Sequence, residues 1–323
     1  MLFRSDKTQN PHSSQNLLIG ACGWSYKDDW KGVFYPTELK PNQFLEFYSH
    51  IFSTVEIDSS FYRIPTKKIV QTWVHRTPSQ FTFSGKIPKE VSHDKGLEFA
   101  EIKDPLLNYL DNISPLESSN KMLAHLLQLP PKFSIDHISN LETFFSYWNE
   151  WRETNGKHIS GAKYNAQSWR LVVEFRHPSW MVEKAFELLR QYNIAYCAVV
   201  EPLLPPRMDI TRDDLFYMRF HGYGKNPWFN YLFSQKEIAD WAKMIKNSLD
   251  ANPKTKHVAY FNNHFSGNAV KNALDLMPLV DLSPQNTLET AAKQFQQDNA
   301  KKSLKIDKKG KSLDKWINKQ KTG

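Results

Sequence analysis

The sequence has 323 residues, of which 40% are hydrophobic and 24% are charged, and its formal net charge is +8. This composition is typical of a folded globular chain and excludes wholesale disorder, and no stretch approaches the roughly 18 apolar residues of a membrane span. The polar segment 1–16 lacks the apolar centre of a signal peptide. Two cysteines, Cys22 and Cys197, are too few for a disulfide framework. We therefore expect a cytoplasmic protein that does not enter a membrane.

Short apolar runs alternate along the chain with longer amphipathic segments. The apolar runs predict strands at 17–24, 54–61, 80–87, 122–129, 169–176, 194–201, 215–223 and 257–264. The amphipathic segments predict helices at 42–52, 67–76, 102–110, 139–153, 181–192, 237–250 and 269–276. Eight strand–helix units over roughly 260 residues fit a (β/α)₈ TIM barrel, an α/β fold with a parallel sheet. An open, doubly wound sheet is the alternative, because no helix is predicted between the sixth and seventh strands.

The alternating pattern defines one domain, 17–282, between a flexible segment, 1–16, and a basic tail, 283–323. Residues 291–323 contain ten lysines and three aspartates, a net charge of +7, which leaves about +1 for the rest of the chain. A lysine-rich, aromatic-poor end is expected to be disordered and attracted to polyanions such as nucleic acid. A tail that only increases solubility is the alternative.

Polar residues occupy strand positions that point into a barrel. Where the apolar residues of a strand face the helices, alternation turns every second residue inward. The inward residues predicted in this way are Glu56, Asp58, Ser84, Lys86, Gln128, Glu174, Arg176, Arg219, His221 and Asn262. They fall near the carboxyl ends of their strands, where barrel enzymes carry their chemistry, so we expect one shared cleft. A salt-bridge network that merely closes the barrel is the alternative, although buried ion pairs stabilise poorly compared with apolar packing.

Aromatic residues lie in the loops that follow several strands. Trp24, Tyr62 and Trp180 are placed there and are predicted to stack on a substrate above the polar cleft. Packing beneath the loops is the alternative for each of them.

Histidines also follow or end several strands. His93, His177 and His221, with the nearby carboxylates, could hold a divalent metal ion. The sequence contains no closely spaced ligand pair apart from Glu174-x-x-His177. Histidines that only form hydrogen bonds are the alternative, and no metal is assigned.

A set of eight motifs resembles the YecE-like family, a family of unknown function. In chain order the motifs are GACGWSY at 20–26, FYP at 34–36, VEIDSSFYR at 55–63, FSGKIP at 83–88, QLPPKF at 128–133, EFRHPSW at 174–180, RFHG at 219–222 and YFNN at 260–263. The resemblance covers about residues 17–280, implies a TIM barrel and implies no activity. It marks these positions as the polar cleft of the family: Glu56, Lys86, Gln128, Glu174, Arg176, His177, Arg219, His221 and Asn262. His93 matches a further family histidine, although Ser92 replaces the threonine that usually flanks it.

The end of the tail resembles the peptide with which DNA repair and replication proteins bind the sliding clamp. Within 310–317, Leu313, Trp316 and Ile317 lie on one face of a helical turn that could enter a hydrophobic groove. Gly310 replaces the usual glutamine, and Ile317 replaces the commoner second aromatic residue. An incidental short helix is the alternative.

Three functions are compatible with these features. The first is a hydrolase, of phosphodiesterase or nuclease type, acting on a nucleic acid or nucleotide in DNA maintenance. Its phosphate would be held by Lys86, Arg176 and Arg219, with Glu56, Glu174 and His221 as catalytic groups or metal ligands. Gln128 and Asn262 would contact the substrate.

The second possible function is a metal-free carbohydrate or small-molecule acid–base enzyme with Glu56 and Glu174 as paired carboxylates. The third is a non-catalytic adaptor that binds nucleic acid or the clamp.

Overall fold

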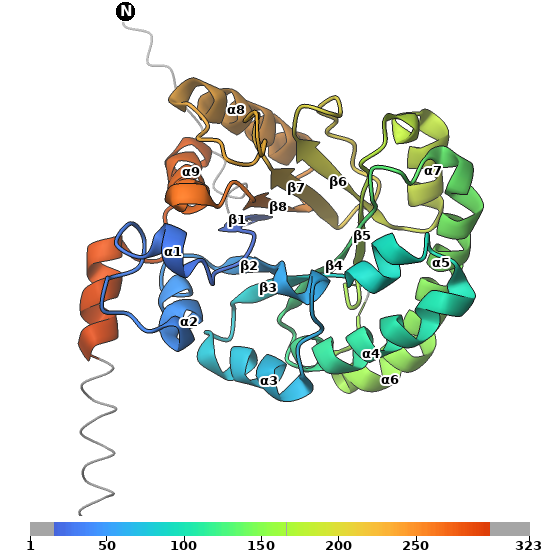
Figure 1. The fold of residues 1–323 in the computed structure, drawn as a ribbon, viewed down its shortest axis with the longest axis horizontal. Coiled ribbons are helices and arrows are strands. Elements are labelled where there is room, and N and C mark those ends of the chain that lie inside the picture. The colour runs from blue at the N-terminus through green and yellow to red at the C-terminus, as the bar shows by residue number, and fades with distance from the viewer. Residues whose placement is uncertain (1–15, 166, 298–323) are drawn as a thin grey trace, which may run out of the picture.

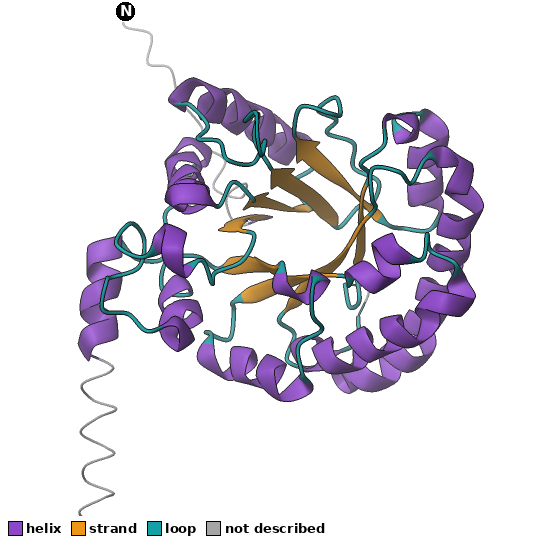
Figure 2. Cartoon of the chain, in the orientation of Figure 1, coloured by secondary structure: helices purple, strands orange, loops and turns teal. Residues whose placement is uncertain are grey.

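The computed structural model of the protein describes residues 16–165 and 167–297. Eight parallel strands form a nearly closed barrel at its centre, and helices surround the barrel (Figures 1 and 2). The strands are β1 Leu17–Ala21, β2 Thr54–Ile57, β3 Thr82–Lys86, β4 Met122–Gln128, β5 Leu171–Glu174, β6 Ala195–Val200, β7 Leu215–Phe220 and β8 Lys256–Phe261. Their order in the sheet is β1-β8-β7-β6-β5-β4-β3-β2, which is the order of a TIM barrel opened between β1 and β2.

The seam between β1 and β2 is closed at its carboxyl end. A parallel bridge joins Cys22 to Glu56, and the backbone N–H of Gly23 donates to the Glu56 carbonyl at 2.8 Å. A Cβ atom at Gly20 would lie 2.4 Å from the carbonyl oxygen of Thr54, so only glycine allows the two strands to approach this closely. The predicted TIM barrel is confirmed, and the alternative of an open sheet is excluded.

The outer layer consists of helices of unequal length. They are α1 Lys27–Trp30, α2 Phe44–Tyr48, α3 Lys67–Arg76, α4 Phe99–Ser118, α5 Ile138–Trp151, α6 Lys157–Ser160, α7 Glu183–Gln191, α8 Gln235–Ala251 and α9 Asn268–Leu276. Local signals fix some ends: Thr66 caps α3, and Ser234 with Glu237 forms a capping box at the start of α8. None of the described helices is both long enough and apolar enough to cross a membrane.

Most predicted elements have counterparts in the structure. All eight strands are present, and α3 has the predicted bounds. No helix separates β6 from β7, as the sequence indicated. Helix α4 is longer than predicted, because Ile113 and Leu116 continue its buried face beyond residue 110. The short helices α1 and α6 were not predicted.

The domain continues past the predicted boundary at residue 282. Residues 288–297 are helical, and this segment lies beside α2 (Figure 1). Ala291 is completely buried, and the Phe295 ring packs edge-on against Phe47 with centroids 5.9 Å apart. The first part of the predicted disordered tail therefore belongs to the folded domain, because its apolar face packs against α2. The predicted disorder of 298–323 and of 1–15 lies outside the described residues.

Successive side chains along each barrel strand belong alternately to two apolar clusters, one outside the barrel and one inside it. Residues such as Val55, Phe83 and Val173 face the helices and join the large outer core. Val172, Cys197 and Tyr260 belong to a smaller cluster inside the barrel. The inner cluster fills the barrel beneath the polar residues, so that it forms the base on which the cleft stands.

Candidate active site

A cavity of about 220 Å³ opens at the carboxyl end of the barrel. Its polar lining consists of Asp58, Lys86, His93, Gln128, Arg176, His221, Asn262 and His264, and its aromatic lining of Tyr62, Trp228 and Phe229. The side chains come from the ends of six strands and from the loops that follow them. The shared cleft that strand alternation predicted is therefore present at the expected end of the barrel.

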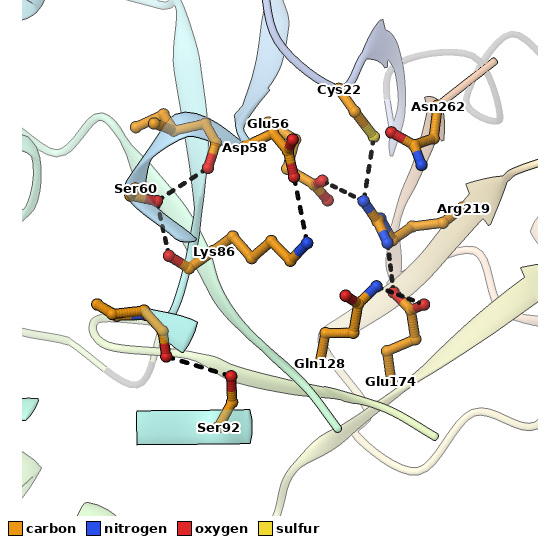
Figure 3. Close-up of polar contacts among 12 residues, drawn as sticks. Cys22, Glu56, Asp58, Ser60, Lys86, Ser92, Gln128, Glu174, Arg219 and Asn262 are labelled. Carbon is orange, nitrogen blue, oxygen red and sulfur yellow. Dashed lines mark hydrogen bonds and ion pairs between the residues drawn. The ribbon is translucent and has the colours of Figure 1, made fainter. Parts of the chain in front are cut away.

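Arg219 lies beneath the cavity between two carboxylates (Figure 3). Its guanidinium donates to Glu56 at 2.8 Å and to Glu174 at 2.5 Å, and it also contacts the Cys22 sulfur at 3.6 Å. Tyr217 donates to the second oxygen of Glu56 at 2.6 Å. Arg219 is 1% exposed and both glutamates are 0% exposed. Neither glutamate lines the cavity, so both serve as its floor.

Arg176 continues the network toward β6. It is paired with Glu174 and donates to Glu201 at 2.6 Å. Gln128 also donates to Glu174, at 2.9 Å. The result is a chain of alternating charges in the order Glu56, Arg219, Glu174, Arg176 and Glu201. We call these five side chains the buried charge chain.

The two carboxylates at Arg176 differ in their protonation. Burial opposes ionisation of Glu174, but Arg176 and Arg219 hold its pKa well below the usual range. Burial and the negative charge of Glu174 raise the pKa of Glu201 to about 7, although Arg176 and Arg219 act to lower it. Within the part of the chain that the structure describes, Oε1 of Glu201 is buried without a hydrogen-bond partner. Glu201 therefore exchanges a proton near neutral pH, whereas Glu174 stays ionised.

His221 is a neutral imidazole in this network. Burial and the charges of Arg176 and Arg219 lower its pKa to about 3. Its Nε2 lies 2.9 Å from a guanidinium nitrogen of Arg176, which can only donate, so Nε2 accepts and the proton lies on Nδ1. Nδ1 lies 2.9 Å from the side-chain amide of Asn262. The amide oxygen must therefore face His221, which leaves the amide NH₂ group for other partners.

Lys86 and Asp58 form an ion pair on the cavity wall. The ammonium lies 3.2 Å from the carboxylate and 3.9 Å from the centre of the Phe61 ring. Their side chains are 7% and 23% exposed, so both reach the cavity. Burial and the charge of Lys86 lower the pKa of His93 to about 4, so His93 is also neutral at pH 7. Nδ1 of His93 is bonded to the Ser92 hydroxyl at 2.9 Å.

The three predicted stacking residues have different positions. The Tyr62 side chain is 76% exposed and lines the cavity. Trp24 lines a neighbouring cavity. Trp180 is completely buried, stacks on Phe175 and donates to the Phe133 carbonyl at 2.7 Å. This position corrects the prediction for Trp180, because a ring enclosed in the outer core cannot stack on a substrate.

The predicted histidines do not gather into a metal centre. His93 and His221 line the cavity, whereas His177 bonds the Ser179 hydroxyl at 2.8 Å in the loop after β5. Among residues 16–165 and 167–297, no three His, Cys, Asp or Glu side chains are grouped as they would be around a metal ion. Each of the three histidines instead forms a hydrogen bond with a protein side chain.

Strand alternation predicted nine of the cavity and floor residues but missed Glu201. Glu201 directly follows β6 and shares its alternation with Cys197 and Val199, both in the inner cluster. This alternation would have predicted that Glu201 points into the barrel. Phe229 was also missed, because it lies in an irregular loop after β7 that has no periodic pattern. The predicted clamp-binding residues Leu313, Trp316 and Ile317 lie outside the described residues.

Comparison with known proteins identifies the family. Residues 18–297 match the model of a protein family of unknown function, DUF72. The chain is 25% identical over 290 residues to the UPF0759 protein YunF of Bacillus subtilis, which covers 82% of this chain and 95% of YunF. It is 32% identical to the UPF0759 protein YecE of Escherichia coli over 89 residues, covering 28% of this chain and 31% of YecE.

Two solved structures have a similar fold. A DUF72 family protein from Thermotoga maritima is 28% identical, with a TM-score of 0.66, and the match covers 82% of this chain and 99% of the other. A DUF72 family protein from Enterococcus faecalis is 22% identical, with a TM-score of 0.65 and coverage of 83% and 98%. The chain belongs to the DUF72 family, and the predicted membership of the YecE-like family is confirmed.

Proposed function

We propose that this protein is an enzyme that binds a small, uncharged, polyhydroxylated molecule in the cavity and transfers protons on it. One observation carries the proposal: each cation predicted to bind the substrate is already paired with a carboxylate. Arg219 bonds Glu56 and Glu174, Arg176 bonds Glu174 and Glu201, and Lys86 bonds Asp58. The cations of the cleft are therefore neutralised before any ligand enters.

A phosphate-bearing substrate fits this arrangement less well. A phosphate group would bring about −2 charges into a region in which four carboxylates already surround three cations. Arg219 is 1% exposed and is covered by the cavity floor, so it could bind phosphate only by leaving its glutamates unpaired. An uncompensated buried charge is expensive. Lys86, Arg176 and Arg219 are therefore poorly suited to hold a phosphate, and the predicted hydrolysis of nucleic acids or nucleotides in DNA maintenance has less support than a neutral substrate.

A hydroxylated ligand matches the groups that line the cavity. The amide of Asn262, the imidazole of His93 and the Asp58–Lys86 pair supply neutral and paired donors and acceptors around one small space. Hydroxyl groups both donate and accept, so they can be satisfied by such a mixed lining without adding charge. Tyr62 and Trp228 supply the aromatic surfaces on which an apolar sugar face can rest.

Asp58 and Lys86 are the groups best placed for proton transfer. Both reach the cavity, and they lie 3.2 Å apart. In this scheme the Asp58 carboxylate removes a proton from the carbon next to the carbonyl group of an open-chain sugar, and the Lys86 ammonium stabilises the enolate oxygen that develops. The protonated Asp58 then returns the proton to the sugar. Glu56 and Glu174 are not used as the paired carboxylates of this reaction, because both oxygens of each are bonded in the floor.

The test is a search for turnover of neutral monosaccharides by the purified full chain, followed by NMR of the substrate in deuterated water. Asp58→Asn and Lys86→Met should each lower the rate of any conversion or deuterium incorporation at least 100-fold. The matched controls are Asp111→Asn and Lys67→Met. These two residues form an exposed ion pair, with a distance of 2.7 Å between nitrogen and oxygen, that does not line the cavity. Equal rates for the Asp58 variant and the wild-type protein would refute the assigned role.

A further inference from the structure

A second cavity adjoins the first on the side of β1. Its volume is about 240 Å³, and it is lined by Gly23, Trp24, Ser25, Tyr26, Asp58, Ser59 and Tyr62. Asp58 and Tyr62 line both cavities. The second cavity is mostly apolar, whereas the first has nearly equal polar and apolar surface. We call the first the polar cavity and the second the aromatic cavity.

We infer that the two cavities together bind one substrate, in which a hydroxylated head in the polar cavity is joined to a planar ring in the aromatic cavity. This inference rests on the proposed function of the polar cavity and adds the class of molecule: a hydroxylated carbonyl compound that carries a flat ring. Nucleosides and aryl glycosides have this two-part shape without the reactive carbonyl group, so they serve as binding probes. Ligand cavities usually measure roughly 300–1,000 Å³, and each cavity alone is smaller than that range. The two joined volumes fall within it.

The wall between the cavities consists of stacked aromatic rings. Tyr26 lines the aromatic cavity and His264 the polar cavity, and their rings stack with centroids 4.4 Å apart and an interplanar angle of 7°. The Tyr26 hydroxyl donates to the Cys22 carbonyl at 2.7 Å. This bond fixes the ring to the end of β1, so the partition is held by the barrel itself.

The aromatic cavity is also rigid on its outer side. Trp24 packs edge-on against Trp73, with centroids 5.3 Å apart and an interplanar angle of 85°. The Tyr35 hydroxyl donates to the Trp24 carbonyl at 2.6 Å. Gly23 makes the turn at φ +86°, and a Cβ there would lie 3.0 Å from the Tyr26 ring. A fixed aromatic wall of this kind loses little entropy when a flat ring binds.

Tyr62 is the residue that connects the two parts. Single exposed aromatic residues are common on protein surfaces, but Tyr62 is 76% exposed at a position shared by both cavities. Its ring stands perpendicular to Phe61, with centroids 5.1 Å apart, and Phe61 in turn lies under the Lys86 ammonium. Tyr62 is therefore attached to the wall that carries the Asp58–Lys86 pair. A ring that leaves the polar cavity on this side meets Tyr62.

The experiment compares one-part and two-part molecules by isothermal titration calorimetry and ligand-observed NMR. The pairs are D-ribose with adenosine, and methyl with phenyl β-D-glucoside. In at least one pair, the two-part molecule should bind the wild-type protein roughly tenfold more tightly. Tyr62→Ala should remove this advantage, so that the one-part and two-part molecules bind the variant about equally, and Tyr62→Phe should retain it. Met244→Ala, on the exposed face of α8, is the control.

The pair that shows the advantage identifies the ring as a nucleobase or a phenyl group, and either result supports the inference. Binding of a one-part molecule with no gain from the ring, or a gain that persists in Tyr62→Ala, would overturn the inference and leave the proposed function standing. Failure of every one-part and two-part molecule to bind would overturn the proposed function, and with it the inference.

Discussion

The guanidinium of Arg219 lies 2.5 Å from a carboxylate oxygen of Glu174, and both side chains are buried beneath the candidate active site. The pair holds together the ends of β5 and β7, and Glu56 adds β2 on the other side of Arg219. The alternating charges explain why so many ionisable groups can share one barrel interior. Removal of one member takes a charged partner away from each of its buried neighbours, so the buried charge chain can be tested directly by substitution.

Arg219→Met should lower the free energy of unfolding by about 3–5 kcal/mol, because it leaves Glu56 and Glu174 as buried carboxylates without their common cation. Arg190→Met is the matched control, since Arg190 forms an exposed pair with Glu183 at 2.6 Å. That control should cost less than about 1 kcal/mol. Urea unfolding at pH 7 measures both. Similar losses for the two variants would mean that the buried charge chain does not stabilise the barrel.

His221 should make the protein less stable in acid. Its pKa is lowered to about 3 in the folded protein, whereas the unfolded chain has the ordinary value of about 6.5. Below pH 6.5 the unfolded state therefore binds a proton that the folded state does not, and stability falls by about 1.4 kcal/mol per pH unit. Between pH 7 and pH 5, wild type should lose about 2 kcal/mol more than His221→Asn. Parallel stability curves for the two proteins would contradict this assignment.

Glu201 should have the opposite effect on pH dependence. Its folded pKa is raised to about 7, so its contribution is fully present below about pH 4.5 and is lost as the pH rises through 7. Glu201→Gln cannot titrate and should not show this loss. The difference in free energy of unfolding between variant and wild type should move in favour of the variant by about 3 kcal/mol from pH 4.5 to pH 8. Denaturant titrations across this range measure it, and a constant difference would show that Glu201 has an ordinary pKa.

The helix at 288–297 should contribute to the stability of the domain. Phe295→Ala removes a buried ring that packs on Phe47, and a loss of about 3 kcal/mol in the free energy of unfolding is expected. Gln294→Ala changes an exposed neighbour and should have little effect. Thermal unfolding of the full chain separates the two variants. If both were as stable as wild type, the folded domain would end near residue 282, as the sequence pattern indicated.

Strand alternation predicted the barrel and much of the site because the two faces of a barrel strand differ in polarity. Lys86, Glu174 and Arg219 are charged residues within apolar strands, so their inward direction could be predicted from their neighbours. The partners of each charge could not be predicted, because they depend on how strands distant in sequence lie around the barrel.

Loop residues were harder to place than strand residues. Trp24 and Trp180 both follow strands, yet one lines a cavity and the other is enclosed in the core. Trp24 packs against Trp73, which is distant in sequence. Trp180 packs against Phe175, from which an irregular loop separates it. Polarity and period carry no information about such contacts.

The most direct test of the account is a calorimetric comparison of neutral sugars with their phosphorylated forms, such as D-ribose with ribose 5-phosphate and D-glucose with glucose 6-phosphate. The account predicts that the neutral molecule binds more tightly in each pair it recognises, and that Lys86→Met weakens this binding while Lys67→Met does not. Tighter binding of the phosphorylated form, lost in Lys86→Met, would contradict the claim that the cations of the cleft are already neutralised by carboxylates. It would favour a phosphate-bearing substrate.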